Sequence, residues 1–548
     1  MCKMCKKNIY LTFFLLFLLI SLTACGELVG INPAGILQHI NEATQSAEPQ
    51  RVAETDDLEL EDEVESDLEP MANPRLHPVA TMDDGILRLS MRPPITLNPL
   101  LNEDVTVAPI LRLIFEPIIT LDEEMRPVGN IADLQFASDF SSVLLTIGSD
   151  VIWSDGLPVT SDDLIFSVET LRRAPATVIY KNNVSNISQV QRIDSRTVRI
   201  FFTQASVTAG KALNFPIIPQ HHYQNENNPR SVRNMNPVGN GPFMFESHIP
   251  MRSITLVRNS NSFRSRAQIE EVEIIFLPDS YTELHAFDQG RIDVLHLPLT
   301  EWVRHHSVRP SRHETFPAMY FEFIGFNTWN NIFHDVHNRQ AIAHAFNLNT
   351  TVSQVYLAQA VPSITPIHPY TWASTAVNPP IFDPSRARAL LGSINPEYPL
   401  VIIANEENTQ RVSIANILAR SLTDVGLPTI AEVIPSYEYF ARLQLRDFDL
   451  YIGGVAMPFI PDVRFLFGGG FYFNDPLLDS LFIAMNSATT ESAYTQAVLQ
   501  FNQTFAEQLP VIGLAFRHSA VHTSMRVQAG ISPAPDHIFA NINTWVIG

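Results

Sequence analysis

Apolar and polar residues follow regular patterns through most of the chain after residue 85, and these patterns predict both strands and helices. Residues 86–90 alternate with a period of two, and this segment and four other short ones are predicted to be strands. These segments are residues 86–90, 143–147, 197–201, 254–257 and 271–276. Their spacing leaves room for helices and long connections, which indicates a mixed α and β protein.

Helix-capping residues accompany apolar stripes at helical spacing in two places. The segment 160–163 (TSDD) puts acids in the first turn of a helix, and its apolar stripe is Leu164, Ile165, Val168 and Leu171. Further along, Asp383 precedes Pro384, and Gly392 follows the last apolar residue. Asp before a helix, Pro at its first position and Gly past its end are typical boundary residues.

The later part of the chain alternates between helix and strand. Residues 412–425 are amphipathic and stop at Gly426, and Ser436 is predicted to cap a helix over 437–446. A buried strand is expected at 448–452. This alternation predicts an α/β lobe with a partly parallel sheet.

The amino-terminal 25 residues have the layout of an exported lipoprotein. A basic start is followed by an apolar run over residues 9–22 and then by Leu22-Thr23-Ala24-Cys25. This order is typical of a secretory signal, and a small residue before Cys resembles a bacterial lipobox. We therefore expect a signal peptide at 1–24, with Cys25 acylated. A single transmembrane anchor is the alternative, but the run is shorter than the roughly 20 residues needed to span a bilayer.

Cysteine usage agrees with an exported chain that depends on its hydrophobic core. The three cysteines are Cys2, Cys5 and Cys25. Removal of the signal leaves Cys25 alone, so the mature chain contains no disulfide framework and no structural zinc built on thiolates.

The charge is strongly acidic and partly local. The formal net charge is −21, and residues 54–69 hold ten acids and no base. Such a block repels itself, so residues 25–84 are predicted to form a disordered tether; cation binding is the alternative. An acidic chain is also a poor candidate for nucleic-acid binding, which requires basic patches.

Motifs for catalysis and cofactor binding are absent from the sequence. We find no nucleophile elbow, phosphate loop, zinc-protease helix or dinucleotide fingerprint. Histidines cluster at 221–222, 305–306 and 334–337, without carboxylates in a ligand pattern. We therefore expect no metal, no cofactor and no enzymatic activity.

An ordered series of motifs resembles the bacterial extracellular solute-binding proteins for peptides, nickel and related solutes. The most specific is VIWSDGLPVTSDD at 151–163. The others are LRLIFEP at 111–117 with LD at 121–122, PVGNGPF at 237–243, RNSNSF at 258–263, GRIDV at 290–294, FN at 326–327, FHD at 333–335 and RQAI at 339–342. Their order is that of the family and covers nearly all of residues 86–548.

The resemblance implies an α/β fold of the type II periplasmic-binding-protein class, a two-lobe clamshell with an extra subdomain in the first lobe. Lobe 1 would comprise 85–122, 236–315 and 517–548, the subdomain 123–235, and lobe 2 residues 316–516. A small solute or peptide would bind between the lobes, and the closed form would deliver it to an ABC permease. The chain is expected to act as a monomer at the cell membrane.

The resemblance also implies a set of ligand-binding residues. These are Val105, Gly325, Phe326, Asn327, Val455, Ala456, Met457 and Asp462. In peptide-binding relatives an acid at the position of Met457 pairs with the α-amino group of the peptide. A Met cannot neutralise an ammonium, so the ligand is expected to be capped, sugar-like, cyclic or otherwise non-peptide, unless Asp462 substitutes. Sensing or adhesion without transport, or an exported hydrolase, are the alternative functions.

Overall fold

The structure is a computed structural model and describes residues 84–548 apart from 227, 298–306, 330, 376, 393, 395, 458, 460–462 and 468–472. The predicted signal peptide, Cys25, the tether up to residue 83 and Asp462 lie outside the described residues. Asp84, the last residue of the predicted tether, is part of the fold and pairs with Arg88 and Arg526. All described residues belong to one compact unit of the chain.

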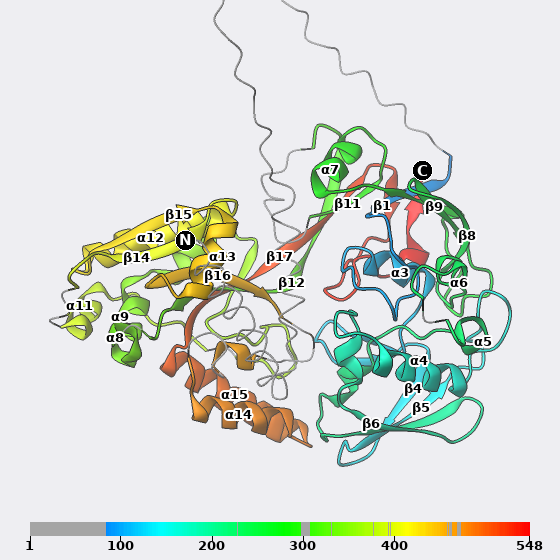
Figure 1. The fold of residues 1–548 in the computed structure, drawn as a ribbon, viewed down its shortest axis with the longest axis horizontal. Helices are drawn as coiled ribbons and strands as arrows, with labels where there is room; N and C mark the ends of the chain where they lie inside the picture. The colour runs from blue at the N-terminus through cyan, green and yellow to red at the C-terminus, as the bar shows by residue number, and fades with distance from the viewer. Residues whose placement is uncertain are drawn as a thin grey trace, which may run out of the picture. The chain divides into compact units, whose positions relative to one another are not determined.

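A mixed sheet with strand order β1-β10-β9-β8 lies near both ends of the described chain (Figure 1). Its strands are β1 (Ile86–Met91), β10 (Glu271–Phe276), β9 (Ser253–Arg258) and β8 (Phe243–Ile249). β1 runs parallel to β10, and the other pairs are antiparallel. The predicted strands at 86–90, 254–257 and 271–276 are thereby confirmed.

A second, antiparallel sheet has the order β4-β5-β7-β6. It contains β4 (Ala132–Phe136), β5 (Ser142–Ile147), β7 (Thr197–Phe202) and β6 (Ile187–Arg192). Helix α4 (Ser161–Arg173) packs with this sheet. It begins with a capping box formed by Thr160 and Asp163, as the TSDD segment predicts.

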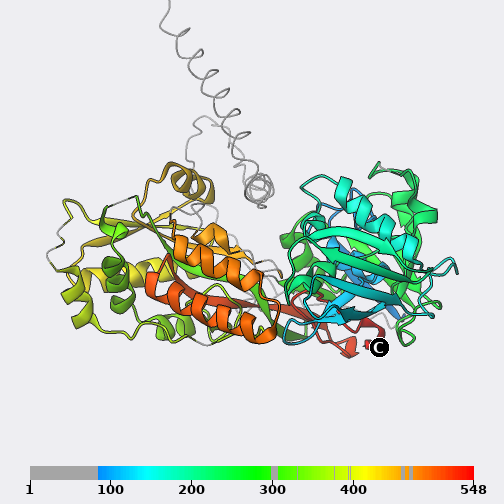
Figure 2. The same cartoon turned by 90° about the horizontal axis from the view of Figure 1, so that it is seen from below.

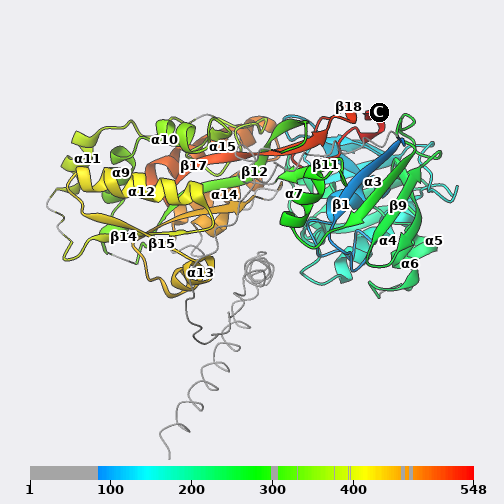
Figure 3. The same ribbon diagram turned by 90° about the horizontal axis from the view of Figure 1, so that it is seen from above.

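A third sheet has the order β11-β17-β12-β16-β14-β15, with β13 beside β17. The bounds are β11 (Val294–Leu297), β12 (Ser311–Phe326), β13 (Ala360–Pro362), β14 (Leu400–Asn405), β15 (Thr429–Ile434), β16 (Leu450–Ala456) and β17 (Val511–Ser524). β14 is parallel to both β15 and β16, and Figure 3 shows α12 (Thr409–Asp424) running alongside β14 and β15. The predicted partly parallel sheet is confirmed.

The long strands β12 and β17 join two parts of the hydrophobic core. Phe316 and Val521 lie in a core built mainly from residues before 295. Phe321 and Phe516, further along the same strands, lie in a core built from later residues. The antiparallel pairing of β12 with β17 is irregular between Pro317 and Phe321. The strand pair therefore changes core where its hydrogen-bond ladder is interrupted.

The remaining helices cover the sheets or connect them. Figure 2 shows α14 (Pro476–Asn486) and α15 (Glu491–Gln508) side by side. The others are α3 (Ala108–Ile114), α5 (Gln220–Tyr223), α6 (Val232–Met235), α7 (Ser280–Asp288), α8 (Asn331–His334), α9 (Val336–Ala345), α10 (Leu348–Val355), α11 (Pro384–Leu391) and α13 (Ser436–Leu445). Short 3-10 helices and two-stranded sheets complete the fold. The 3-10 helices are η1 (Lys181–Val184), η2 (Ala209–Leu213), η3 (Arg464–Leu466) and η4 (Ile542–Thr544). The short sheets pair β2 (Ile119–Leu121) with β3 (Pro127–Gly129), and β18 (Val527–Ala529) with β19 (Val546–Ile547). In the described part of the chain, no helix is both long and apolar enough to cross a bilayer.

Predicted boundaries in the later half differ from the structure by one to four residues, and α12 begins at Thr409 instead of residue 412. Ser436 is the first residue of α13 and not its cap, because its backbone N–H and hydroxyl both donate to the carboxylate of Glu407. The predicted strand 448–452 starts at Leu450 instead and continues to Ala456, because it keeps pairing with β12. By contrast, α11 begins after Asp383 and ends at Gly392 as predicted.

Candidate functional site

The predicted ligand-binding residues are distributed along the paired strands β12 and β16. Val455 pairs with Phe321, and Ala456 pairs with Tyr320, at the end where β16 leaves the sheet. Gly325 pairs with Tyr451 five residues further along β12. At about 3.3 Å per residue, the two groups are about 17 Å apart along the strand. The structure therefore does not gather the predicted residues at one point.

Residues 325–327 have extensive contacts within the protein. A Cβ on Gly325 would lie 2.0 Å from the ring of Tyr451, so only glycine allows this close approach. Phe326 is buried in the apolar core. The side-chain amide of Asn327 donates to the carbonyl oxygens of Arg446 and Phe448, at 3.1 and 2.8 Å. These contacts hold the loop before β16, and a role in ligand binding stays a prediction.

At the other end of the strand pair, Ala456 is exposed and Val455 is half-buried. The next residue, Met457, is 6 % exposed and packs in the apolar core that includes Phe321 and Phe467. The Met457 backbone N–H donates to the carbonyl of Met319 at 2.7 Å. Of these three, Ala456 is therefore the one whose side chain reaches the surface.

A buried cluster of charges lies directly beneath this end of β16. Glu322 is fully buried, and its carboxylate accepts from Arg411 Nε at 3.1 Å and from Arg517 Nη1 at 3.2 Å. The hydroxyl of Tyr320 accepts from Arg411 Nη2 at 3.2 Å. Arg411 comes from the first turn of α12 and Arg517 from β17. Three separate elements thus bring two cations and one anion together.

The electrostatics of this cluster favour the charged form of Arg411. Burial lowers the pKa of its guanidinium, but the charge of Glu322 together with Tyr320 and Tyr439 raises it by more, so the net shift is upward. Arg517 also lies over the ring of Tyr356, 5.4 Å from its centroid. With two guanidiniums around one carboxylate, the cluster carries a net positive charge.

Gly454 lets the strand lie against these charges. A Cβ at this position would come within 2.6 Å of Arg411 Nη2 and of Glu322 Oε2. The backbone of β16 therefore covers the cluster at a distance that a side chain would prevent. We take the exposed end of β16, with the buried cluster of Glu322, Arg411 and Arg517 beneath it, as the candidate functional site.

The other predicted positions lie elsewhere. Val105 is 49 % exposed, in a turn before α3 that the Asp104 carboxylate and carbonyl hold together. None of the contacts found among the described residues joins Val105 to β12 or β16. Asp462, the predicted substitute for an amine-binding acid, is outside the described residues.

The motif acids that carried the resemblance mostly stabilise the scaffold. Asp163 is buried and accepts from the backbone N–H of Thr160 and of Gln220, both at 2.8 Å. Its carboxylate also receives the indole N–H of the fully buried Trp153 at 3.4 Å. The first turn of α4 and the Asp155-Gly156 turn, where Gly156 has φ +89°, are thereby joined.

Two further motif acids bind arginines. Glu116 is paired with Arg264, which also donates to Asn130. Asp293 is 1 % exposed and accepts from Arg526 Nη1 at 2.9 Å, and from the hydroxyl of Ser524 at 2.7 Å. The contacts of Asp293 join the end of β17 to the segment before β11.

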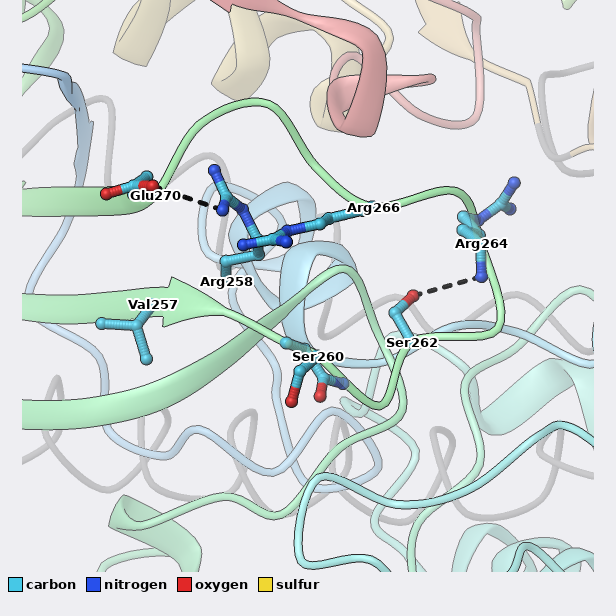
Figure 4. A pocket seen from close by; sticks show the side chains of 8 residues that line it. Val257, Arg258, Ser260, Ser262, Arg264, Arg266 and Glu270 are labelled. Atoms are coloured by element: carbon cyan, nitrogen blue, oxygen red, sulfur yellow. Dashed lines mark hydrogen bonds and ion pairs between the residues drawn. The ribbon is translucent and has the colours of Figure 1, made fainter.

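A cavity of about 480 Å³ lies beside the end of β9 (Figure 4). It is lined by Val257, Arg258, Asn259, Ser260, Ser262, Arg264, Arg266 and Glu270. Arg258 donates to the carbonyls of Gln268 and Ile269 and pairs with Glu270. This cavity contains none of the predicted ligand-binding residues, and two of its three guanidiniums are used within the scaffold.

The buried cluster of Glu322, Arg411 and Arg517 was not predicted, although the sequence contains features that indicate a buried charge. Glu322 interrupts an otherwise apolar stretch of β12, MYFEFIGF at residues 319–326. A buried strand with one acid requires a cationic partner. The adjacent Gly453 and Gly454 indicate close packing across the sheet. The identity of the partners depends on folding, because Arg411 and Arg517 are distant in sequence.

Metal ligands are not grouped in the described part of the chain: it contains no cluster of three or more His, Cys, Asp or Glu able to hold an ion.

The fold and the family are established by comparison with known proteins. The family described as "Bacterial extracellular solute-binding proteins, family 5 Middle" matches residues 128–472. The chain belongs to this family, and its fold is that of the type II periplasmic binding proteins. Its members are solute-binding proteins rather than enzymes.

Individual relatives share little sequence identity with this chain but align with it over more than half of its length. A protein of Brucella ovis whose name describes an ABC transporter peptide-binding protein is 22 % identical over 338 residues, 59 % of this chain. The chain spans 64 % of that relative's length. Oligopeptide-binding protein AppA of Bacillus subtilis is 20 % identical over 499 residues, 83 % of this chain and 90 % of AppA.

Solved structures show the same fold. The substrate-binding protein CtaP of Listeria monocytogenes superposes with a TM-score of 0.74 at 17 % identity, covering 84 % of this chain and 98 % of CtaP. AppA of Bacillus subtilis in complex with a nonapeptide gives a TM-score of 0.62 at 19 % identity, covering 84 % of this chain and 99 % of AppA.

Proposed function

We propose that this protein is an extracytoplasmic solute-binding protein that captures a small solute, a peptide or a peptide-like molecule, and delivers it to an ABC importer. The observation that carries the proposal is the family match over residues 128–472 together with the type II fold. In such folds a ligand that contacts two lobes only in the closed form drives closure by its differential affinity. The names of AppA and of the Brucella ovis protein support peptides as the first ligand class to test.

The ligand is proposed to bind where β16 leaves the sheet. Ala456 and Val455 line this end, and the cluster of Glu322, Arg411 and Arg517 fixes the backbone beneath them. A rigid, fully bonded support is what a binding site requires of its surroundings. Met457 offers no charge for a ligand ammonium, so ligands without a free α-amino group are expected to bind best.

Calorimetry on the full-length protein tests the ligand class. The ligands are matched pairs of oligopeptides with free and acetylated amino termini, together with neutral sugars. Binding of acetylated peptides at least as tight as binding of free peptides supports the role proposed for Met457. Clearly tighter binding of free peptides would show that an acid elsewhere pairs with the ammonium.

We also propose that the mature protein is anchored to the cell membrane through a lipid on Cys25. The motivation is the basic start, the apolar run and the small residue before Cys25. Metabolic labelling with a palmitate analogue should mark the wild type and not Cys25→Ser. Equal labelling of both proteins would contradict the anchor.

Transport is separated from sensing or adhesion by an uptake measurement. Cells that lack the protein should import the solute more slowly, and the wild-type gene should restore uptake. Unchanged uptake of a solute that the purified protein binds tightly would favour sensing. No observation on the described residues supports the alternative of an exported hydrolase.

A further inference from the structure

One buried lysine has an ammonium that forms no hydrogen bond or ion pair with any residue that the structure describes. Lys211 lies in the single turn η2 and is 2 % exposed. No described residue forms a hydrogen bond or an ion pair with its side chain. Between residues 84 and 548 the only other lysine is Lys181, which donates to the carbonyls of Leu171 and Arg172 at 3.1 and 2.6 Å. Lys211 therefore differs from the chain's one comparable lysine.

The surroundings of Lys211 do not compensate its charge. Asp122 is the acid that acts on it, but its carboxylate accepts from the backbone N–H of Glu124 and of Arg126, at 3.0 and 2.8 Å, and holds its own turn. Burial lowers the pKa of Lys211 to about 8, against a smaller opposing effect of Asp122. Such a shift is the mark of an ammonium that lacks solvation.

Segments around Lys211 contact residues from a distant part of the sequence. Val207, four residues before Lys211, donates its backbone N–H to the carbonyl of Ala488 at 2.9 Å. The turn after β2, next to η2, contacts Trp372. The backbone N–H of Trp372 donates to the carbonyl of Glu124 at 3.0 Å, and the Arg126 guanidinium lies 4.2 Å from the Trp372 ring centroid. Val207 also lies in the same apolar core as Ile367, the residue before His368, so Lys211 and His368 come from segments that share one core.

The segment around Trp372 contributes a second unsatisfied donor, His368. It is 3 % exposed, and its ring packs edge-on against Phe516 at 4.5 Å. Its Nδ1 accepts from the backbone N–H of Tyr370 at 3.3 Å, which places the proton of the neutral ring on Nε2. Nε2 has no partner among the described residues. Burial, the charge of Lys211 and that of His518 keep the pKa of His368 down at about 4, so the ring is neutral at physiological pH.

We infer that Lys211 and His368 form a subsite for a carboxylate of the ligand, which would accept from the ammonium of Lys211 and from Nε2–H of His368. Burying two hydrogen-bond donors without an acceptor costs free energy. A carboxylate has two oxygens and can accept a hydrogen bond from each donor. A neutral ligand would leave the ammonium unpaired. This inference rests on the proposed function and narrows its ligand to an organic acid, which includes a peptide with a free carboxyl terminus.

The first test compares acids with their neutral counterparts. The probes are N-acetylated peptides with free carboxyl termini, the same peptides as carboxamides, simple organic acids and neutral sugars, measured by calorimetry on the full-length protein. We expect binding among the carboxylates and a loss of roughly 10- to 150-fold in Lys211→Met, the range for hydrogen bonds to a charged group. Lys211→Arg should retain part of the affinity, and His368→Phe should weaken it less than Lys211→Met.

The matched control is Lys181→Met, which removes the other lysine and should leave carboxylate affinity unchanged. Melting temperatures of all variants confirm that each is folded; Lys211→Met keeps the aliphatic stem and removes a buried charge, so it should be at least as stable as the wild type.

The second test measures protons. At pH 9 an ammonium with a pKa of about 8 is roughly nine-tenths neutral. A bound carboxylate raises that pKa, so binding at pH 9 should take up close to one proton, seen as an enthalpy that depends on the buffer. At pH 6 Lys211 is already protonated and should take up none. The uptake at pH 9 should disappear in Lys211→Met.

The outcomes separate the inference from the proposed function. Solutes that bind equally as acids and amides, or equally to wild type and Lys211→Met, would overturn the subsite and leave solute binding standing. If no probe of any class binds and no small molecule copurifies in native mass spectrometry, the proposed function fails and the subsite fails with it.

Discussion

Replacing Glu322 by Gln should strongly destabilise the protein. Glu322 is fully buried and neutralises part of the charge of Arg411 and Arg517, its partners at 3.1 and 3.2 Å. The amide keeps the size of the side chain and removes its charge, which leaves two buried guanidiniums facing a neutral group. Breaking a buried ion pair from one side costs about 3–5 kcal/mol. For a region of about 200 residues this corresponds to a fall in melting temperature of roughly 6–20 °C.

Differential scanning calorimetry of Glu322→Gln measures this effect against a matched control. Glu432→Gln removes the same charge from a surface pair with Arg442, where the Glu432 side chain is 37 % exposed. Surface pairs contribute at most about 1 kcal/mol, so this variant should melt close to the wild type.

A triple variant separates charge from packing. Glu322→Leu, Arg411→Met and Arg517→Met together remove every charge of the cluster and keep its volume. Apolar replacement of a whole buried ion cluster is commonly neutral or stabilising, so this protein should melt near or above the wild type. If Glu322→Gln melts no lower than Glu432→Gln, the cluster is not desolvated as the structure indicates, and the reasoning is refuted.

Three further predictions concern backbone packing, acid stability and the amino-terminal segment. Gly325→Ala should lower stability by about 1–3 kcal/mol, because the new Cβ would overlap the buried ring of Tyr451; thermal melts check this. Hydrogen bonding from Arg88 lowers the pKa of Asp84 to about 2, so its contribution to stability is present above about pH 4 and is lost as the pH falls from 4 to 2. Asp84→Asn should therefore be less stable than the wild type at pH 6, and the difference should shrink as the pH falls to 2 in acid-unfolding curves. Deletion of residues 48–82, a like-charged stretch without apolar periodicity, should move the melting temperature by less than about 5 °C.

Local patterns in the sequence were sufficient to predict several strands and helices of the described chain. The strand β10 coincides with its prediction, because the burial of Glu271–Phe276 alternates along the strand and both of its neighbours in the sheet pair along its length. Helix α11 likewise begins and ends at its predicted caps, Asp383 and Gly392. A predicted helix boundary is wrong where a distant residue binds the side chain expected to cap the helix. The hydroxyl of Ser436 donates to the carboxylate of Glu407, a residue that follows another strand.

The candidate site was less predictable, because its residues meet only through the tertiary fold. Glu322 is conspicuous in an apolar strand, but nothing in the sequence identifies Arg411, at the start of a helix, and Arg517, in another strand, as its partners. The family resemblance indicated residues on β12 and β16, and their role in ligand binding stays a prediction. The resemblance indicated Met457, whose side chain is buried among apolar residues, while the exposed side chain at that end of β16 belongs to Ala456.

The interior near the site has the opposite sign to the chain as a whole. The protein carries a formal charge of −21, yet the cluster of Glu322, Arg411 and Arg517 has one more cation than anions. Lys211, in another buried position, is a further cation that forms no ion pair with the described residues. A surface of net negative charge repels anions over roughly a Debye length, and buried cations attract them only at short range, where screening is weak. Affinity for an acidic ligand would therefore come from desolvated contacts inside the protein, with the overall charge acting against encounter. Ionic strength should consequently affect the association rate more than the dissociation rate of such a ligand.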